Sequence, residues 1–236
     1  RYFDRITRPE QIISSIQQAI QVRLDPADCG PACISLSQDV QGEVFEYPED
    51  FFKERVHVIR RPKPDDYQIK EAAELIKKSK KPLIISGGGV FYSDATDELS
   101  SFATKHNIPV TQTVMGYSTM KKDHSHYLGA IGGLGGRAAN NLSKETDMAI
   151  AIGTKLADFT TGSWTNFENP DFKLVSINAA RFDANKHMAQ AIVGDAKVSL
   201  MELSQALGDW KADNNWYEKS RIELKNWESY VDKESG

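Results

Sequence analysis

Residues 81–90 read Lys-Pro-Leu-Ile-Ile-Ser-Gly-Gly-Gly-Val, and this stretch decides how the rest of the chain is interpreted. A short apolar run that is entered through proline and left through three glycines is typical of a buried parallel strand that ends in a tight turn. A helix is expected to follow from about Ser93. The stretch therefore predicts the first strand of an open α/β domain.

Similar apolar runs alternate with helical patterns over residues 66–208. Further strands are expected at 108–111, 148–152, 174–177 and 191–193, with helices between them. Strands that alternate with helices form a parallel sheet that is covered on both faces through right-handed crossovers. The predicted fold class is therefore α/β, with an open, doubly wound, mostly parallel sheet and helices on both faces.

The composition is that of an ordinary globular protein, because 40% of the 236 residues are apolar and 26% are charged. The net charge of −4 and the scattered lysines and arginines offer no basic patch for nucleic acid or a membrane surface. No apolar stretch approaches the roughly 20 residues that span a bilayer, and the first residues lack a signal-peptide core. The sequence predicts a soluble, cytoplasmic protein without a nucleic-acid or membrane partner.

The only cysteines, Cys29 and Cys33, are separated by three residues. A structural zinc site usually has four ligands, and no second pair of Cys or His residues lies nearby in the sequence. We therefore expect both thiols to be free and reduced, and we predict no metal site in this chain.

Four segments are expected along the chain. Residues 1–44 contain an amphipathic helix and a strand at about 32–37, for which no partner strand is evident. Residues 45–65 are irregular and contain several prolines, which is typical of a connector between domains. Residues 66–208 form the α/β domain. Residues 209–236 form a helix that either folds back on this domain or leads into another one.

Three glycine-containing turns follow predicted strands, at 87–89, 132–136 and 153–155. In doubly wound sheets, ligands bind beyond the C-terminal ends of the strands, where glycine lets a phosphate approach the backbone amides. Together the three turns suit an ADP-like group. Neither Gly-x-Gly-x-x-Gly nor Gly-x-x-x-x-Gly-Lys-[Ser/Thr] is present in the required arrangement, so plain tight turns in a fold inherited from a nucleotide binder remain the alternative.

No combination of nucleophile and base stands out. The two histidines of Lys-Lys-Asp-His-Ser-His at 121–126 are expected in a solvated loop, because a third metal ligand is missing. Two histidines at apparent helix ends favour positive charge there without a catalytic role, and two isolated aspartates are typical of caps and turns: His106, His187, Asp158 and Asp183. No catalytic residue is therefore predicted in this chain.

Several motifs occur in a fixed order. Besides residues 81–90 they are Ile-Pro-Val-Thr-Gln-Thr-Val-Met-Gly at 108–116, Leu-Gly at 128–129, Gly-Gly-Arg-Ala-Ala-Asn at 135–140, Asp-Met-Ala-Ile-Ala-Ile-Gly-Thr-Lys-Leu at 147–156 and Val-Gly-Asp at 193–195. This ordered set resembles the central domain of thiamine-diphosphate-dependent enzymes of the acetohydroxyacid synthase type. Gly-Pro-Ala-Cys-Ile-Ser-Leu-Ser-Gln-Asp-Val-Gln-Gly at 30–42 resembles the end of their pyrimidine-binding domain, so the resemblance extends from about residue 10 to 208.

Within this family, residues 2–11 and 92–94 are most similar to hydrolases of myo-inositol catabolism. The resemblance implies an enzyme whose thiamine ylide attacks a cyclic diketone, cleaves the bond between the carbonyl carbons and yields 5-deoxyglucuronate. It also implies that the catalytic glutamate lies before Arg1, and that the Gly-Asp-Gly motif for magnesium and diphosphate lies after Gly236. This chain is then an inactive internal part of a homodimer or homotetramer, and the missing flanking domains bind thiamine diphosphate and Mg²⁺.

Some members of the family hold FAD or ADP in the central domain, and this chain departs from their pattern. Where acetohydroxyacid synthases read Gly-x-Arg-Phe-Asp-Asp-Arg, residues 153–159 read Gly-Thr-Lys-Leu-Ala-Asp-Phe, and Asn178 stands where an acid is expected near a ribose. No FAD is therefore expected. Any ADP-like ligand is expected at a vestigial cleft formed by Gly87, Gly88, Gly89, Gly133, Gly135, Gly136, Lys155 and Asn178.

Other functions stay open on the sequence. The chain is also compatible with another enzyme of the same family, a lyase or transferase of the acetohydroxyacid synthase type. A stand-alone ADP- or NAD-binding module has the same domain type, although NAD-dependent deacylases usually carry a four-cysteine zinc module. A pure interaction module would use the aromatic helix that follows Trp210.

Overall fold

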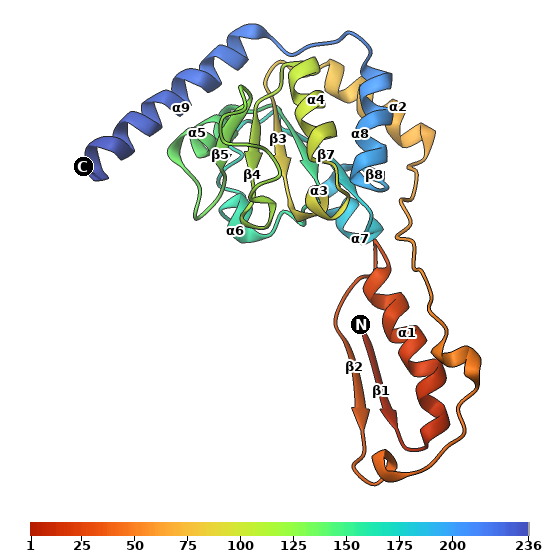
Figure 1. Cartoon of the computed structure of the whole chain (residues 1–236). Coiled ribbons are helices and arrows are strands. Elements are labelled where there is room, and N and C mark those ends of the chain that lie inside the picture. Colours follow the sequence, from red (N-terminus) through yellow and green to blue (C-terminus); the bar gives the residue numbers. More distant parts are fainter. Residues whose placement is uncertain (236) are drawn as a thin grey trace. The chain divides into compact units, whose positions relative to one another are not determined.

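The computed structural model describes residues 1–235 and divides into two compact units. The first unit comprises Arg1–Arg60, and the second begins at Arg61. In Figure 1 the first unit is red and orange, and the second runs from yellow to blue. Among the described residues, no helix combines the length and apolar character that crossing a membrane requires.

The first unit contains two parallel strands and one helix. Strand β1 (Tyr2–Ile6) leads through the 3-10 turn η1 (Pro9–Gln11) into helix α1 (Ile12–Leu24), and strand β2 (Ala32–Leu36) follows. The two strands pair along their whole length. The expectation that the strand near residue 32 has no partner is therefore wrong. The partner was missed because Tyr-Phe-Asp-Arg-Ile carries two charged residues in a short segment and lacks an apolar run.

The chain that follows β2 packs through aromatic rings within the first unit. Two 3-10 turns occur here, η2 (Val40–Gly42) and η3 (Glu49–Phe52). The ring of Tyr47 stacks on that of Phe51 with centroids 5.5 Å apart, and its hydroxyl donates to the Pro9 carbonyl at 3.3 Å. This segment is therefore held to the turn that precedes α1.

The second unit is built on one six-stranded sheet in which every neighbouring pair is parallel, in the order β5-β4-β3-β6-β7-β8. The strands are β3 (Pro82–Ser86), β4 (Val110–Gln112), β5 (Tyr127–Ala130), β6 (Met148–Ile152), β7 (Lys173–Asn178) and β8 (Gln190–Val193). The predicted α/β fold class is confirmed. Strand β5 was not expected, because Tyr-Leu-Gly-Ala is short and contains a glycine that weakens the strand pattern.

The chain builds this sheet outward from its middle. From β3 it proceeds to β4 and β5, and it then returns to the other side of β3 for β6, β7 and β8. This reversal places the loops that follow β3 and β6 beside each other at the C-terminal ends of the strands, the position where open α/β sheets bind ligands. We call this side of the sheet the carboxyl edge, and the opposite side the amino edge.

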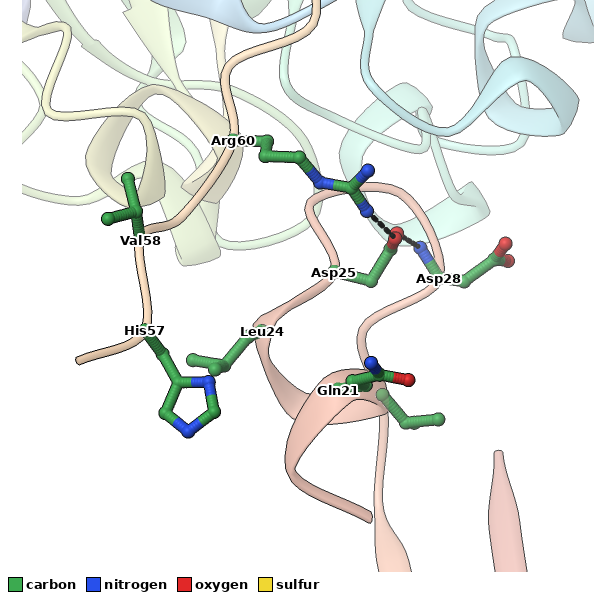
Figure 2. Close-up of a pocket in the computed structure, with 8 residues that line it drawn as sticks. Gln21, Leu24, Asp25, Asp28, His57, Val58 and Arg60 are labelled. Atoms are coloured by element: carbon green, nitrogen blue, oxygen red, sulfur yellow. Dashed lines mark hydrogen bonds and ion pairs between the residues drawn. The ribbon is translucent and has the colours of Figure 1, made fainter. Parts of the chain in front are cut away.

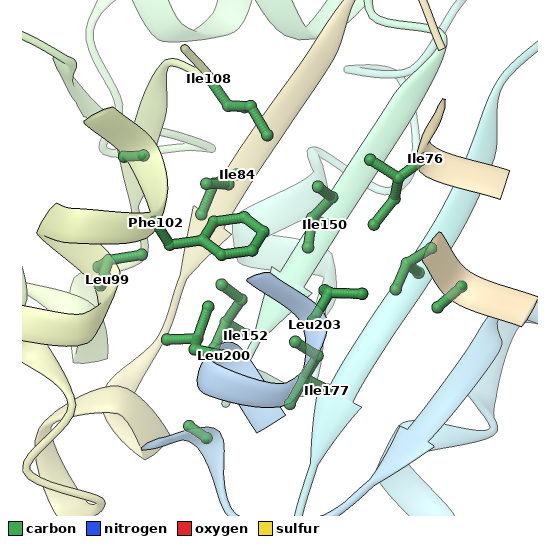
Figure 3. Packing of buried hydrophobic residues seen from close by; sticks show 14 of the residues in the cluster. Ile76, Ile84, Leu99, Phe102, Ile108, Ile150, Ile152, Ile177, Leu200 and Leu203 are labelled. Atoms are coloured by element: carbon green, nitrogen blue, oxygen red, sulfur yellow. The ribbon is translucent and has the colours of Figure 1, made fainter. Parts of the chain in front are cut away.

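Three helices cover one face of the sheet: α2 (Asp66–Lys77), α4 (Thr96–His106) and α8 (Ala196–Leu207). Their apolar stripes pack on every second residue of the strands, as the period of two along a strand requires. Figure 3 labels the main members of this core: Ile76, Ile84, Leu99, Phe102, Ile108, Ile150, Ile152, Ile177, Leu200 and Leu203.

Helices α5 (Arg137–Glu145) and α9 (Asn214–Ser235) cover the other face, where Leu83 and Ile85 point. Short elements follow the strands at the carboxyl edge: α3 (Gly88–Tyr92), η4 (Val114–Gly116), α6 (Asp158–Thr161) and α7 (Arg181–Ala184). The 3-10 turn η5 (Lys186–Met188) precedes β8. The helix expected from about Ser93 begins at Thr96 as α4, and the short helix α3, which was not expected, precedes it.

The first part of α9 folds back on the second unit. The indole N–H of Trp216 donates to the Pro82 carbonyl at 2.8 Å, and Leu224 is buried in the core beside α5. From Glu228 to Ser235 the helix is exposed. The helix therefore closes one face of the domain and then continues into solvent.

Candidate functional site

The loops that follow β3 and β6 touch through their backbones. The N–H of Gly87 donates to the Ile152 carbonyl at 2.8 Å, and that of Gly89 donates to the Gly153 carbonyl at 2.9 Å. A Cβ atom on Gly87 would lie far inside the van der Waals contact distance of the Gly153 carbonyl oxygen. Glycine is required here because two loops approach closely, and two of the amides that could face a phosphate are already bonded.

A buried polar network holds the loop after β4 against the same place. The Ser86 hydroxyl lies 2.6 Å from that of Thr119, and the amide of Gln112 donates to the Thr119 hydroxyl at 3.2 Å and to the Met120 carbonyl at 3.0 Å. All three polar side chains are buried and bonded. Sequence reasoning missed this network because serine, glutamine and threonine carry no pattern when they stand singly. The network fixes the carboxyl edge around residues 113–120.

The second glycine turn, 132–136, is closed in a similar way. The N–H groups of Gly133, Gly135 and Gly136 donate to the carbonyls of Phe159, Gly132 and Ala130 at 2.8 to 2.9 Å. The three N–H donors of this turn are therefore all bonded within the protein, and the bond to the Phe159 carbonyl connects the turn to α6.

Lys155 and Asn178 lie in the loops that follow β6 and β7. The Lys155 side chain is exposed. The Asn178 amide donates to the Thr154 carbonyl at 3.2 Å, and its oxygen accepts from the Ala180 N–H at 3.0 Å. The structure thus brings the eight predicted residues to one edge of the sheet, where seven of them are glycines or an asparagine that shape the loops. Binding of an ADP-like ligand there stays a prediction.

The carboxyl edge also carries exposed apolar side chains, which sequence reasoning did not single out. Eight large side chains in the loops after β3, β4, β5, β6 and β7 are between 51% and 77% exposed. They are Phe91, Tyr92, Val114, Met115, Tyr117, Leu134, Phe159 and Phe182. We call these residues the apolar edge surface. Exposed apolar groups on this scale mark places where a protein contacts another surface.

The histidines that the sequence singled out lie at the amino edge, because they precede β4, β5 and β8, whereas Asp158 and Asp183 lie in α6 and α7 at the carboxyl edge. His106 is fully buried, with Nδ1 2.7 Å from the Trp210 carbonyl and Nε2 3.0 Å from the Ser204 hydroxyl. Burial lowers its pKa. The expectation of a cationic helix end at His106 is therefore wrong, because α8 and the Trp210 segment cover the ring.

His126 is buried as well and does not lie in a solvated loop. Its ring lies 4.6 Å from that of Tyr217 on α9, and Nε2 is 3.3 Å from the Asn107 side-chain oxygen. Burial lowers the pKa of His126 to about 4, with smaller effects from His124 and Arg221. Within residues 1–235, no three His, Cys, Asp or Glu side chains gather in a group that could hold a metal ion.

The first unit has a pocket of about 480 Å³ between the end of α1 and residues 57–60 (Figure 2). Asp25 is its central polar group. The carboxylate accepts the N–H groups of Ala27 at 2.8 Å and Asp28 at 2.7 Å, and these bonds lower its pKa. Arg60 lies 3.8 Å from the other oxygen. The carboxylate therefore organises the turn after α1 and is not poised for acid–base chemistry.

Comparison with known proteins adds a family and a set of relatives. The family model described as "Thiamine pyrophosphate enzyme, central domain" matches residues 69–203. The chain is 46% identical over 220 residues to the 3D-(3,5/4)-trihydroxycyclohexane-1,2-dione hydrolase of Clostridium perfringens, which covers 93% of this chain and 34% of that protein.

Two further relatives carry the same name. The Bacillus subtilis protein is 46% identical over 213 residues, which cover 90% of this chain and 33% of the relative. The Clostridium tetani protein is 44% identical over 245 aligned positions, which cover 99% of this chain and 38% of the relative. The chain thus spans about a third of the length of the curated relatives it matches.

Proposed function

Because the chain belongs to the thiamine pyrophosphate enzyme family, whose central domain it carries, we propose that it is the middle part of a 3D-(3,5/4)-trihydroxycyclohexane-1,2-dione hydrolase. The observation that carries this proposal is the 44–48% identity to relatives of that name over nearly the whole chain. In this reaction water cleaves the bond between the two carbonyl carbons. One carbon becomes a carboxylate and the other an aldehyde, which gives the open chain of 5-deoxyglucuronate.

Thiamine diphosphate and Mg²⁺ belong to this proposal through the family. The diphosphate-bound magnesium needs several oxygen ligands, and the described residues offer no acidic cluster for it. We therefore assign cofactor binding to parts of the enzyme outside these 236 residues, and no step of the reaction to residues of this chain. The chain alone is expected to be inactive.

The role left to this chain is structural, and the apolar edge surface supports it. Residues such as Phe91, Met115 and Phe159 stand on loops that glycine packing and the Ser86–Thr119 network hold in place. A fixed apolar surface of this kind suits contact with another folded domain. Its partner in this proposal is the remainder of the enzyme, and the whole enzyme is a homodimer or homotetramer.

The same edge is proposed to hold no flavin. The backbone N–H groups of Gly87, Gly89, Gly133, Gly135 and Gly136 are bonded within the protein, which supports this expectation. A stand-alone ADP- or NAD-binding module is the second candidate. Its support is the location of Gly87 and Gly89 at the switch between β3 and β6, where doubly wound sheets bind nucleotides.

An exchange of segments tests the proposal. Residues 1–236 replace the matching third of the Bacillus subtilis relative, and the resulting protein is assayed for thiamine diphosphate binding and for hydrolysis of the trihydroxy dione. The same exchange with an acetohydroxyacid synthase central domain is the control. We expect activity only with this chain. A folded exchange protein that binds thiamine diphosphate and leaves the dione intact would contradict the proposal.

A thermal-shift series on the 236-residue chain separates the two candidates. Thiamine diphosphate with magnesium and FAD are expected to leave the melting temperature unchanged, because a ligand stabilises only a state that binds it. A saturable rise with ADP or NAD would favour the nucleotide-binding module.

A further inference from the structure

The amino edge has a hollow beside β7 and β8. Helices α5 and α9 pack at the β5 end of one face of the sheet. The connections before and after β7 contain only short elements, namely α6 and α7, of four residues each, and the 3-10 turn η5, of three. A cavity of about 640 Å³ lies there. It is lined by Leu75, Trp164, Phe167, Phe172, Lys173, Leu174, His187, Met188, Ala189 and Gln190. Its size falls within the range of small-molecule sites, roughly 300 to 1,000 Å³.

Four aromatic rings form one wall of this cavity. The centroid of Trp164 lies 4.5 Å from that of His187 and 5.6 Å from that of Phe167, which in turn lies 4.6 Å from Phe172. The rings of Trp164, Phe167 and Phe172 are only partly buried. Partly open aromatic faces along a concave wall suit a planar ligand that stacks on them.

The backbone of two lining segments is strained. Ser163 and Trp164 have φ values of 52° and 70°, and His187 and Met188 have values of 59° and 55°. These four are half of the eight non-glycine residues with positive φ in the described chain. Side chains with a Cβ atom rarely adopt this conformation, and it tends to persist at binding sites, where the placement of a side chain matters. Both segments contribute residues to the aromatic wall or the rim.

The charge of the lining selects the kind of ligand. None of the ten lining residues is acidic, and Lys173 and His187 are the ones that can carry positive charge. The ammonium group of the nearby Lys186 is paired with the Asp183 carboxylate at 2.5 Å, so its charge is already balanced within the protein. Met188, which is fully exposed, stands at the rim and can adapt to a bound ring.

We propose that this cavity is a binding site for a small planar aromatic anion, which stacks on Trp164 and pairs its negative group with Lys173. The site lies where β7 and β8 begin, away from the glycine loops at their ends. It is therefore independent of the hydrolase proposal and of any nucleotide at the carboxyl edge.

Fluorine NMR of the 236-residue chain labelled with 5-fluorotryptophan tests the site. The four tryptophans give separate signals, which Trp→Phe variants assign. With 2-naphthoate as the probe, we expect a saturable shift of the Trp164 signal alone. Trp227 serves as the internal control, because its aromatic ring also lies beside a cation, the guanidinium of Arg137. Shifts spread over several tryptophans, or no saturation at about millimolar probe, would overturn the proposal.

Variants separate stacking from charge. Trp164→Ala is expected to weaken 2-naphthoate binding about tenfold, as measured by calorimetry. Lys173→Gln changes an exposed side chain and leaves the fold intact, so it should weaken 2-naphthoate roughly threefold but leave the neutral 2-naphthamide unchanged. Met201→Ala, on exposed α8 surface, is the matched control with unchanged binding. Equal loss of both probes in Lys173→Gln, or no loss in either variant, would contradict the assignment.

Discussion

The two edges of one sheet use their residues in opposite ways. At the carboxyl edge, glycines such as Gly87 and Gly153 bring loops into backbone contact, and the apolar side chains remain outside. At the amino edge, His106 and His126 are buried, and Trp164 borders a cavity in a strained backbone conformation. Two loops are thus in backbone contact at the carboxyl edge, whereas aromatic rings line a cavity at the amino edge.

The substitution Gly87→Ala disturbs the packing of the carboxyl edge and should have the largest effect on stability. Its Cβ meets the Gly153 carbonyl, which is backbone and cannot turn away. We expect the free energy of unfolding of the second unit to fall by about 3 kcal/mol, in the range of severe overpacking. Urea titration followed by circular dichroism measures the loss.

Gly133→Ala is the matched control for Gly87→Ala. The nearest atoms to its added Cβ are on the Phe159 ring at 3.6 Å, which is ordinary contact. The control should change the unfolding free energy by less than about 0.5 kcal/mol. Similar losses in both variants would mean that close backbone approach does not distinguish the two glycine turns.

Acid should weaken the amino edge through His126. Its folded pKa of about 4 lies below the ordinary value of 6.5, so the unfolded chain binds a proton more readily. This contribution to stability is complete above pH 6.5 and is lost as the pH falls toward about 4. We expect a loss of about 2 kcal/mol over this window, less than the full shift corresponds to, because the ring keeps some contact with solvent.

The control for the acid effect is His126→Gln. The slope of unfolding free energy against pH between 6.5 and 4 should become shallower in this variant, while the slopes from His106 and His124 remain. NMR titration of the His126 ring supplies the pKa directly. A midpoint at or above 6.5 would show that the ring is accessible to protons in the folded protein.

Met188→Gly tests the strain at the amino edge and should have the smallest effect. Met188 has a φ of 55° and a fully exposed side chain, so glycine relieves strain without removing buried contacts. We expect the second unit to gain about 1 kcal/mol of stability. Met201→Gly, at an exposed position inside α8, should instead lose about 1 kcal/mol, and a loss in both variants would argue against strain at Met188.

The sequence was sufficient to predict the central strands and their alternation with helices. Strands β3 and β6 are continuous apolar runs bounded by proline, aspartate or glycine, so their burial on both faces is visible in the sequence. Strands β1 and β5 were missed, because Asp4 and Arg5 interrupt the first and Gly129 the second. Their pairing comes from neighbouring strands, which no local pattern records.

For the candidate site, the sequence placed the glycines correctly at strand ends but could not say what they face. The reason for Gly87 is the position of Gly153, which lies beside it only after the sheet has formed. The burial of His106 depends in the same way on Trp210, which covers it from more than 100 residues away in the chain. Positive φ at Trp164 left no signal, since tryptophan is not a residue that marks such turns.

The bond from Trp216 to the Pro82 carbonyl joins the first strand of the domain to its last helix. A ribosome releases a chain from its N-terminal end, so the face under α2, α4 and α8 can be complete once Leu207 has emerged. The face that carries Leu83 stays uncovered until Trp216 and Leu224 have also emerged. During that interval the nascent domain has an open apolar face, and synthesis of α9 ends the exposure.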